Sequence, residues 1–321
     1  MANGNFGGGD GTALNPYLVE DAHDLDAVRN YLGDETVHFK QVTNIDLSSW
    51  GNWEPIQNGD STSDDDVFRG NYDGGGYKIS NMTCQHSRDN VGLFGYIDSA
   101  TIKNVFVENC NVSGNDYTGG LVGEVYSSTI FNCYSSGSVS GEEWSGYWIG
   151  DWIGGLIGGI SSGSTISNCY FNGNVNGDSR IGGLIGGSSS GSTISNCYFS
   201  GSVSGDSYVG GLIGYILLVT ISNCYSSGSV NGSDSSIGGL VGSGAALTMS
   251  NCYSSSSVIG AYHVAGLVGG GSGKISNCYA LNPFIARTPD SSDSSFSDIT
   301  NSNLTTIENC FSLDTLEFRQ L

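Results

Sequence analysis

The residues best suited to ligand chemistry lie in one aromatic and acidic stretch, Glu142-Glu-Trp-Ser-Gly-Tyr-Trp-Ile-Gly-Asp-Trp152. It holds three of the chain's five tryptophans and three carboxylates. Aromatic faces beside carboxylates suit the apolar faces and hydroxyls of sugars, and inserted loops commonly carry recognition. The stretch therefore predicts a carbohydrate site, while a loop folded back onto its scaffold is an equally good interpretation. The predicted ligand-binding residues are Glu143, Trp144, Tyr147, Trp148, Asp151 and Trp152.

A second group of candidate ligands is purely acidic. Asp64, Asp65 and Asp66 lie between Asp60 and Asp73 in an oxygen-rich segment. Clustered carboxylates can take Ca²⁺, but no spacing here matches a known calcium loop such as the 12-residue EF-hand. We expect Asp64, Asp65 and Asp66 to be the metal ligands if Ca²⁺ binds. Otherwise their charge belongs to the loops of an N-terminal cap.

Motifs for catalysis are missing from the sequence. The four histidines are scattered, and there is no His-Glu-x-x-His motif, nucleophile elbow or phosphate-binding lysine loop. The central part of the chain holds only Arg180 and Lys274 as basic residues. Asp178, Asp206 and Asp234 recur every 28 residues and predict a solubilising acidic row. No catalytic residue is predicted, and a polysaccharide lyase or hydrolase stays the enzymatic alternative.

Two markers recur in register along the chain. The first is Gly-Leu-apolar-Gly, with steps of 28, 35, 28, 28, 28 and 27 residues, and the enlarged step holds the aromatic stretch. The second is Asn-Cys, at a similar phase. Two independent markers in register indicate a repeat architecture. The first marker begins at Gly92, Gly120, Gly155, Gly183, Gly211, Gly239 and Gly266, and the second ends at Cys110, Cys133, Cys169, Cys197, Cys224, Cys252, Cys278 and Cys310.

Each repeat contains three short apolar patches separated by Gly, Asn and Ser turns. In one unit these patches surround Ile166, Val175 and Leu184, a spacing typical of three strands per coil. So short a coil cannot bury its apolar side chains alone, and coils must therefore stack about 4.8 Å apart. The sequence predicts an all-β fold, a right-handed parallel β-helix (β-solenoid) of about eight coils of roughly 28 residues.

The first eighty residues differ from the repeats. Asp21 can cap a short amphipathic helix that carries Leu25, Val28 and Leu32 and stops at Gly33. We expect this helix to cover the first coil, whose open strand edge would otherwise invite aggregation. The predicted units are residues 1–80 as an N-terminal cap segment, 81–280 as the repeat solenoid, and 281–321 as a C-terminal coil or cap.

Three residue types recur once per coil and form rows if the coils stack. The nine cysteines predict a row of buried free thiols, because Cβ atoms about 4.8 Å apart lie beyond the range that disulfides prefer. Thr-x-Ser pairs, interrupted at Lys274, predict outward hydroxyl rows. These rows fit plain strand propensity or, alternatively, ice binding. The tyrosines that follow the cysteines can stack on sugars or on one another.

Ahead of the repeats, short motifs occur in a fixed order: Gly11-Thr-Ala-Leu-Asn-Pro-Tyr-Leu-Val19, Asn44-Ile-Asp-Leu-Ser48, Trp53-Glu-Pro-Ile56, Phe68-Arg-Gly70 and Asp73-Gly-Gly-Gly-Tyr77. Together with the Gly-Leu repeat they resemble the GLUG-motif family of bacterial and archaeal surface proteins, over roughly residues 10–280. Val91 and Ala265 replace the first glycine of their motifs, and the tail beyond Leu281 matches poorly. The resemblance implies a β-helical stalk or adhesive region of a longer exported protein.

The charge balance limits the partners. The chain has 31 acidic and 10 basic residues and a formal net charge of -21, which repels nucleic acid and anionic lipid. No apolar run reaches the roughly 20 residues of a membrane span, and no signal peptide opens the sequence. We expect a secreted or surface-displayed, non-catalytic module for adhesion, carbohydrate binding or a rigid stalk. Its expected partner is extracellular polysaccharide or a partner-cell surface, with no cofactor except the Ca²⁺ considered above.

Overall fold

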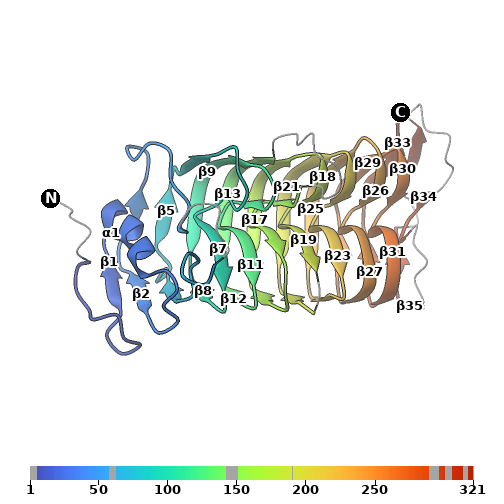
Figure 1. The fold of residues 1–321 in the computed structure, drawn as a ribbon. Coiled ribbons are helices and arrows are strands. Elements are labelled where there is room, and N and C mark those ends of the chain that lie inside the picture. The colour runs from blue at the N-terminus through green and yellow to red at the C-terminus, as the bar shows by residue number, and fades with distance from the viewer. Residues whose placement is uncertain are drawn as a thin grey trace.

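The protein is a straight rod of stacked coils, seen here in a computed structural model (Figure 1). The structure describes residues 6–57, 63–141, 151–189, 191–288, 296–300, 306–313 and 317–320. The chain starts at one end of the rod and advances coil by coil to the other (Figure 1). All strand pairings between the described residues are parallel and join each coil to the next, which confirms the predicted parallel β-solenoid.

The described strands form three sheets. Sheet A consists of β1 (Tyr17–Val19), β2 (His38–Gln41), β4 (Asn71–Asp73), β7 (Phe94–Asp98), β8 (Thr101–Lys103), β11 (Val122–Tyr126), β12 (Thr129–Phe131), β15 (Ile157–Ile160), β16 (Thr165–Ser167), β19 (Ile185–Ser189), β20 (Thr193–Ser195), β23 (Ile213–Leu217), β24 (Thr220–Ser222), β27 (Val241–Ser250), β31 (Val268–Ser276) and β35 (Thr306–Glu308).

Sheets B and C form the other two faces. Sheet B consists of β3 (Ile45–Asp46), β5 (Lys78–Ser80), β6 (Thr83–Gln85), β9 (Phe106–Gly114), β13 (Tyr134–Gly141), β17 (Tyr170–Asn176), β21 (Tyr198–Gly205), β25 (Tyr225–Gly232), β28 (Tyr253–Ser254), β29 (Ser257–Gly260), β32 (Tyr279–Ala280), β33 (Phe284–Arg287), β36 (Phe311–Ser312) and β37 (Glu317–Gln320). Sheet C consists of β10 (Thr118–Gly119), β14 (Ile153–Gly154), β18 (Ser179–Gly182), β22 (Ser207–Gly210), β26 (Ser235–Gly238), β30 (Tyr262–Ala265) and β34 (Phe296–Ser297).

The sheet A face of a coil differs in detail from the prediction of one strand per face. From β7 to β24 it is built from two short strands per coil, such as β23 and β24, with a bend between them, whereas β27 and β31 cross the face as single strands with an irregularity. Leu218 sits in that bend with φ +56°, and Ser127 and Ala246 adopt φ +44° and +54° at the same phase of their coils. A left-handed residue turns the chain sharply, so one face becomes two strands.

From Asn132 onward the Asn-Cys marker is explained by the turn between sheets A and B, whereas Asn109 and Cys110 lie within strand β9. The asparagines at this turn, among them Asn132, Asn196 and Asn277, have φ between +51° and +54°. Asparagine tolerates this left-handed conformation better than most residues with a Cβ. Their amides also bond between coils, as in Asn132 Nδ2 to Asn104 Oδ1 at 2.5 Å. The turn delivers the next residue, cysteine, into the core.

Apolar residues at a fixed phase fill the interior as columns. The isoleucines of the Thr-Ile-Ser strands, including Ile130, Ile166 and Ile194, are fully buried. Eight of the nine cysteines are buried and Cys310 is partly exposed. The predicted row is confirmed from Cys133 onward, but Cys84 and Cys110 lie outside it, because they pair with Val112 and Gly137 within sheet B. Their thiols donate to nearby carbonyls, as Cys197 Sγ does to Ser195 O at 3.1 Å. A single core cluster runs from Val19 to Ile285.

The N-terminal helix is present as predicted, in two parts. Asp21 caps α1 (Ala22–Ala27) through bonds from the backbone N–H groups of His23 and Asp24. The 3₁₀ turn η1 (Val28–Tyr31) follows, and the chain leaves it through Gly33 at φ +76°. Leu25 and Val28 are buried against the first coils. None of the helices in the described residues has the length and apolar character needed to cross a bilayer.

The thiol row gives the first prediction. Burial raises the pKa of the Cys110 thiol to about 11, and the reactive species toward disulfide reagents is the thiolate. In the native protein at pH 8 we expect at most one of the nine thiols, Cys310, to react rapidly with Ellman's reagent, and all nine after unfolding. Cys310→Ser should remove the rapid phase. Several rapidly reacting thiols in the native state would contradict the buried row.

A candidate ligand-binding strip beside the insertion

Only two of the six residues predicted to bind sugar lie in the described part of the chain. Glu143, Trp144, Tyr147 and Trp148 lie outside the described residues, so their role stays a prediction. Asp151 and Trp152 are described and are only 4% and 7% exposed. For these two residues the alternative of a loop folded back onto its scaffold fits better, because they lead directly into β14, whose Ile153 is a core residue. Their side chains therefore form the base of a site rather than its open surface.

A row of glycines creates the space that receives Trp152. Position by position, sheet A places Tyr96, Glu124, Gly159, Gly187 and Tyr215 side by side. A Cβ on Gly159 would lie 2.6 Å from both the Trp152 and the Tyr117 ring, and one on Gly187 would lie 2.8 Å from the Trp152 ring. The two missing side chains leave a trough that these rings fill.

Aromatic and cationic side chains continue from the trough along the rod. Tyr117 and Trp152 pack at 5.6 Å between ring centroids. The Arg180 guanidinium lies 5.9 Å from the Trp152 ring and 5.5 Å from the Tyr215 ring, within the range of cation–π attraction. Tyr208 meets Tyr215 edge to face at 5.8 Å. We call these five residues the aromatic strip; all except Trp152 are partly exposed.

Three residues of the aromatic strip have a left-handed backbone conformation. Tyr117, Arg180 and Tyr208 have φ of +56°, +54° and +55°, a conformation that is uncommon for bulky residues. Each lies one residue before an inward residue of sheet C, at the same phase as Trp152. Residues outside the strip are left-handed at the same phase, with φ of +59° at Asn90, +65° at Ser236 and +50° at His263. This conformation is therefore a feature of the repeating coil, and what distinguishes the strip is the size of its side chains.

Carboxyl groups border the strip at the base of the insertion. Burial, reinforced by the nearby charges of Asp89 and Asp151, raises the pKa of Asp116 to about 7. Burial and the charge of Asp178 also raise the pKa of Asp151. Burial likewise raises the pKa of Glu124, whose carboxylate accepts a hydrogen bond from Ser161. Near neutral pH this border can both donate and accept hydrogen bonds, as sugar hydroxyls require.

The buried indole of Trp152 adds an unused donor. Among the described residues, its Nε1–H has no hydrogen-bond acceptor although the atom is buried. Buried polar groups normally find partners. A ligand hydroxyl is a suitable acceptor at this place, because it would bring its own oxygen to the edge of the trough.

The predicted calcium ligands do not converge. Asp64 points to Arg69, at 3.1 Å from its guanidinium, and its side chain is 78% exposed. Asp64, Asp65 and Asp66 follow one another in a surface turn. In the described part of the chain, no three His, Cys, Asp or Glu side chains are grouped as metal ligands. Successive residues in a turn point in different directions, and an arginine already neutralises one of them.

The tyrosines that follow the cysteines stack on one another, which is one of the two arrangements predicted for them. Neighbouring rings from Tyr134 to Tyr253 stack at 4.5 to 4.9 Å with interplanar angles of 16° or less. Their faces are therefore covered by one another and present only edges and hydroxyls to solvent. The threonine row points outward as predicted, with Thr165, Thr193 and Thr220 exposed and paired in register.

Sequence reasoning missed most of the strip. Tyr117, Arg180 and Tyr208 differ in type, so no motif marks them. Their position within the coil could have identified them, because each directly precedes the inward residue of a sheet C strand. Trp152 shares that phase, and an alignment of the coils by this position would have grouped the four. Asp116 carried no sequence signal, since its raised pKa depends on burial.

Comparisons with known proteins agree with the repeat architecture. The family described as "The GLUG motif" matches residues 114–140, 177–204 and 205–231. Halomucin of Haloquadratum walsbyi is 36% identical over 143 residues, which are 41% of this chain and 2% of halomucin. A protein of Evansella cellulosilytica, provisionally named a Gly-rich membrane protein, is 41% identical over 119 residues, 35% of this chain and 13% of that protein. The chain thus spans a small part of both relatives.

A solved structure shares the fold. A Bacteroides ovatus protein provisionally named an immunoglobulin A1 protease aligns with a TM-score of 0.58 and 19% identity, over 100% of this chain and 82% of that one. At this identity the likeness concerns the fold alone.

The buried carboxyl pair gives the second prediction. Because the folded-state pKa of Asp116, about 7, lies above its unfolded value of about 3.9, the folded protein binds the extra proton. The contribution of Asp116 to stability should be fully present below about pH 4 and be lost as the pH rises to about 7. Asp116→Asn should remove this fall and stabilise the protein at pH 8 by about 1 kcal/mol, since partial exposure screens the repulsion.

Denaturant unfolding between pH 4 and 8 measures this effect. Asp206→Asn, at an exposed position of the acidic row, controls for the loss of one negative charge. An unchanged pH profile in Asp116→Asn, or the same change in both variants, would contradict the assignment.

Proposed function

Because the chain carries GLUG-motif repeats on a parallel β-solenoid, we propose that it is a secreted or cell-surface module that binds polysaccharide without transforming it. The aromatic strip and the insertion beside it form the binding site. The rest of the rod is a stiff scaffold that holds the site away from its attachment point.

The observation that carries this proposal is the open geometry of the strip. Tyr117, Tyr208 and Tyr215 are only partly covered, and the Arg180 guanidinium lies between the rings of Trp152 and Tyr215. Aromatic rings flanked by hydrogen-bonding groups suit sugar rings, which have apolar faces and polar edges. The tyrosine row lacks this property, because its faces are occupied by neighbouring tyrosines.

The surface location rests on the relatives and on the charge. One relative is provisionally named a membrane protein. A net charge of -21 keeps a rod of neutral coils soluble and separate from other copies. The long in-register backbone ladder also leaves few flexible segments for proteases between the described coils.

Binding through the strip gives the third prediction. Tyr215→Ala should weaken binding to a neutral polysaccharide roughly three- to ten-fold, about 0.5–1.5 kcal/mol. Trp148→Ala should weaken it similarly if the insertion takes part. Tyr225→Ala is the matched control, because both faces of that ring are covered by Tyr198 and Tyr253. The measurement is a polysaccharide array followed by calorimetry on each hit.

The control outcomes separate the alternatives. Equal losses in Tyr215→Ala and Tyr225→Ala would contradict the strip as the site. Release of reducing ends or unsaturated products from the same samples would contradict a non-catalytic role and favour the lyase or hydrolase alternative.

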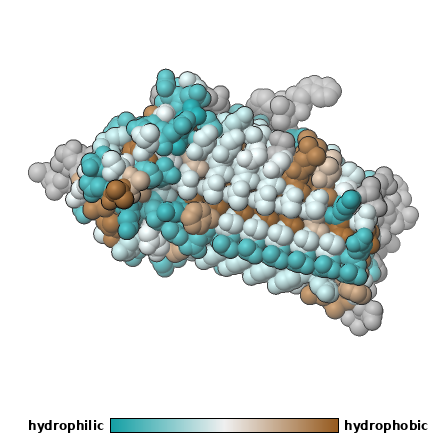
Figure 2. All heavy atoms as spheres, turned by 90° about the horizontal axis from the view of Figure 1, so that it is seen from below, coloured by the Kyte–Doolittle hydropathy of each residue, from teal (hydrophilic) through white to brown (hydrophobic). Residues whose placement is uncertain are grey.

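A second candidate is ice binding by the hydroxyl face. Thr165, Thr193, Thr220 and Thr248 are exposed and form one straight column, and Figure 2 shows such straight rows of polar residues along one face. A spacing of about 4.8 Å is close to the roughly 4.5 Å between second-neighbour oxygens in a tetrahedral water lattice with O–H···O distances of about 2.8 Å.

Ice binding gives the fourth prediction. Thermal hysteresis should be measurable if the column binds ice, and Thr193→Leu should reduce it by more than half by breaking the flat face at its centre. Tyr225→Ala, on sheet B, should leave it unchanged. Absence of hysteresis at millimolar protein would remove this candidate and leave the strip proposal intact.

A further inference from the structure

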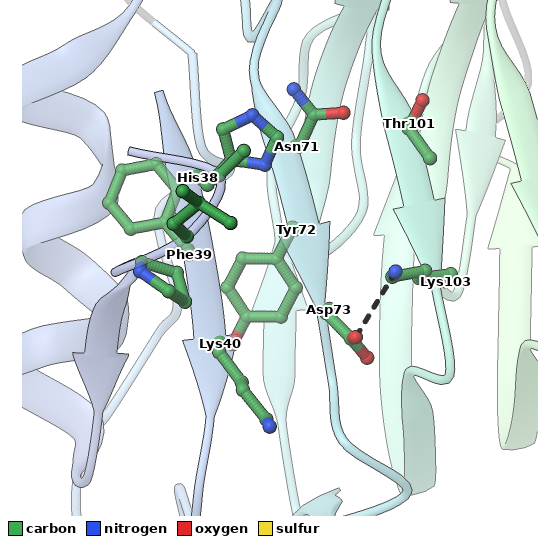
Figure 3. Close-up of a pocket in the computed structure, with 11 residues that line it drawn as sticks. His38, Phe39, Lys40, Asn71, Tyr72, Asp73, Thr101 and Lys103 are labelled. Carbon is green, nitrogen blue, oxygen red and sulfur yellow. Dashed lines mark ion pairs between the residues drawn. The ribbon is translucent and has the colours of Figure 1, made fainter. Parts of the chain in front are cut away.

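A separate hollow lies at the N-terminal end of sheet A, far along the chain from the aromatic strip. It has a volume of about 360 Å³ and lies between the loop containing Leu14 and Pro16 and the outer face of strands β2, β4 and β8 (Figure 3). Leu14 is 98% exposed. An exposed leucine held over a polar strand face makes one apolar wall of an otherwise polar site.

The floor of the hollow is built by strand alternation. Phe39 and Tyr72 point into the core, so the residues on either side of them point outward. Register places His38, Asn71 and Thr101 in one column and Lys40, Asp73 and Lys103 in the next. Figure 3 shows the labelled side chains of both columns along the same face. Six polar side chains thus share one shallow surface.

The second column leaves excess positive charge. Asp73 is already held by Lys103 at 3.3 Å, by Asn104 Nδ2 at 2.8 Å and by the Gly75 N–H at 2.9 Å. Burial works against its ionisation, but these donors outweigh burial and hold the pKa of Asp73 below its usual value. Lys40 is exposed and, among the described residues, no carboxylate lies within 4.0 Å of its ammonium.

This local charge contrasts with the rest of the chain. Lys40 and Lys103 are two of only four lysines in a chain of net charge -21, and both line this hollow. Their strands flank that of Asp73, about 4.8 Å away on each side, so both long side chains can reach one anionic group above Asp73. Asn71, Thr101 and His38 supply neutral hydrogen-bonding groups beside it.

We propose that this hollow binds an acidic sugar residue. Lys40 and Lys103 take its carboxylate or sulfate, the Asn71, Thr101 and His38 side chains take ring hydroxyls, and Leu14 and Pro16 cover its apolar face. Thr101 also begins the outward threonine column, so a longer glycan leaving the hollow would run along the hydroxyl rows. This site is independent of the aromatic strip.

Lys40→Ala tests the proposal most directly, because Lys40 makes no ion pair with the described residues and its loss should not affect folding. Calorimetry is done with trigalacturonate, a sulfated carrageenan oligosaccharide and neutral maltotriose. We expect saturable binding of at least one acidic ligand, weakened roughly ten-fold or more in Lys40→Ala and in Lys103→Ala. Binding should also weaken as salt rises from about 0.02 M to 0.2 M.

Lys274→Ala is the matched control, since Lys274 occupies the threonine column of the same sheet at the far end of the rod. It should bind the acidic ligands as the unmodified protein does. Preference between the carboxylated and the sulfated ligand identifies the anionic group. The proposal is overturned if neither acidic ligand binds, if Lys40→Ala weakens the binding of maltotriose as much as that of the acidic ligands, or if Lys40→Ala changes nothing.

Discussion

Every feature of the molecule depends on parallel, in-register stacking of coils at the strand spacing. The backbone hydrogen bonds of one coil are completed only by the next, as between β17, β21 and β25. Residues at the same position of successive coils therefore lie about 4.8 Å apart. A residue type that occurs at this position in every coil must tolerate contact with copies of itself along the whole row. Isoleucine and cysteine satisfy this condition inside, and threonine, serine and asparagine satisfy it outside.

The same constraint governs where charge can lie. Two like charges 4.8 Å apart repel by about 1 kcal/mol even in water, and a row of them adds these costs along the rod. The central coils are accordingly almost neutral, and Asp178, Asp206 and Asp234 occur in turns where their backbones bond in register. Charged groups that face each other, such as Asp73 and Lys103, alternate in sign across a column.

The fold could be predicted from sequence because a repeat makes the same evidence available many times. Asn-Cys at one phase predicted the buried cysteine row, and Asp21 with Leu25 and Val28 predicted the capping helix. The split of the sheet A face could not be predicted, since Ser127, Leu218 and Ala246 share a left-handed φ but no residue type. The metal site at Asp64, Asp65 and Asp66 stays a prediction, and the sequence did not show that Arg69 forms an ion pair with Asp64.

The candidate site was harder to predict because the proposed binding residues lie where the repeat is broken. In one column of sheet A, Gly159 and Gly187 lie between Glu124 on one side and Tyr215 on the other. Each break is harmless alone, but together they leave a trough with one acidic and one aromatic end, into which Trp152 folds. In the sequence of single coils, Glu124, Gly159, Gly187 and Tyr215 show no relation to one another. Only stacking shows that they are neighbours, and so a solenoid can gain a binding site by changing a few outward positions without altering any inward one.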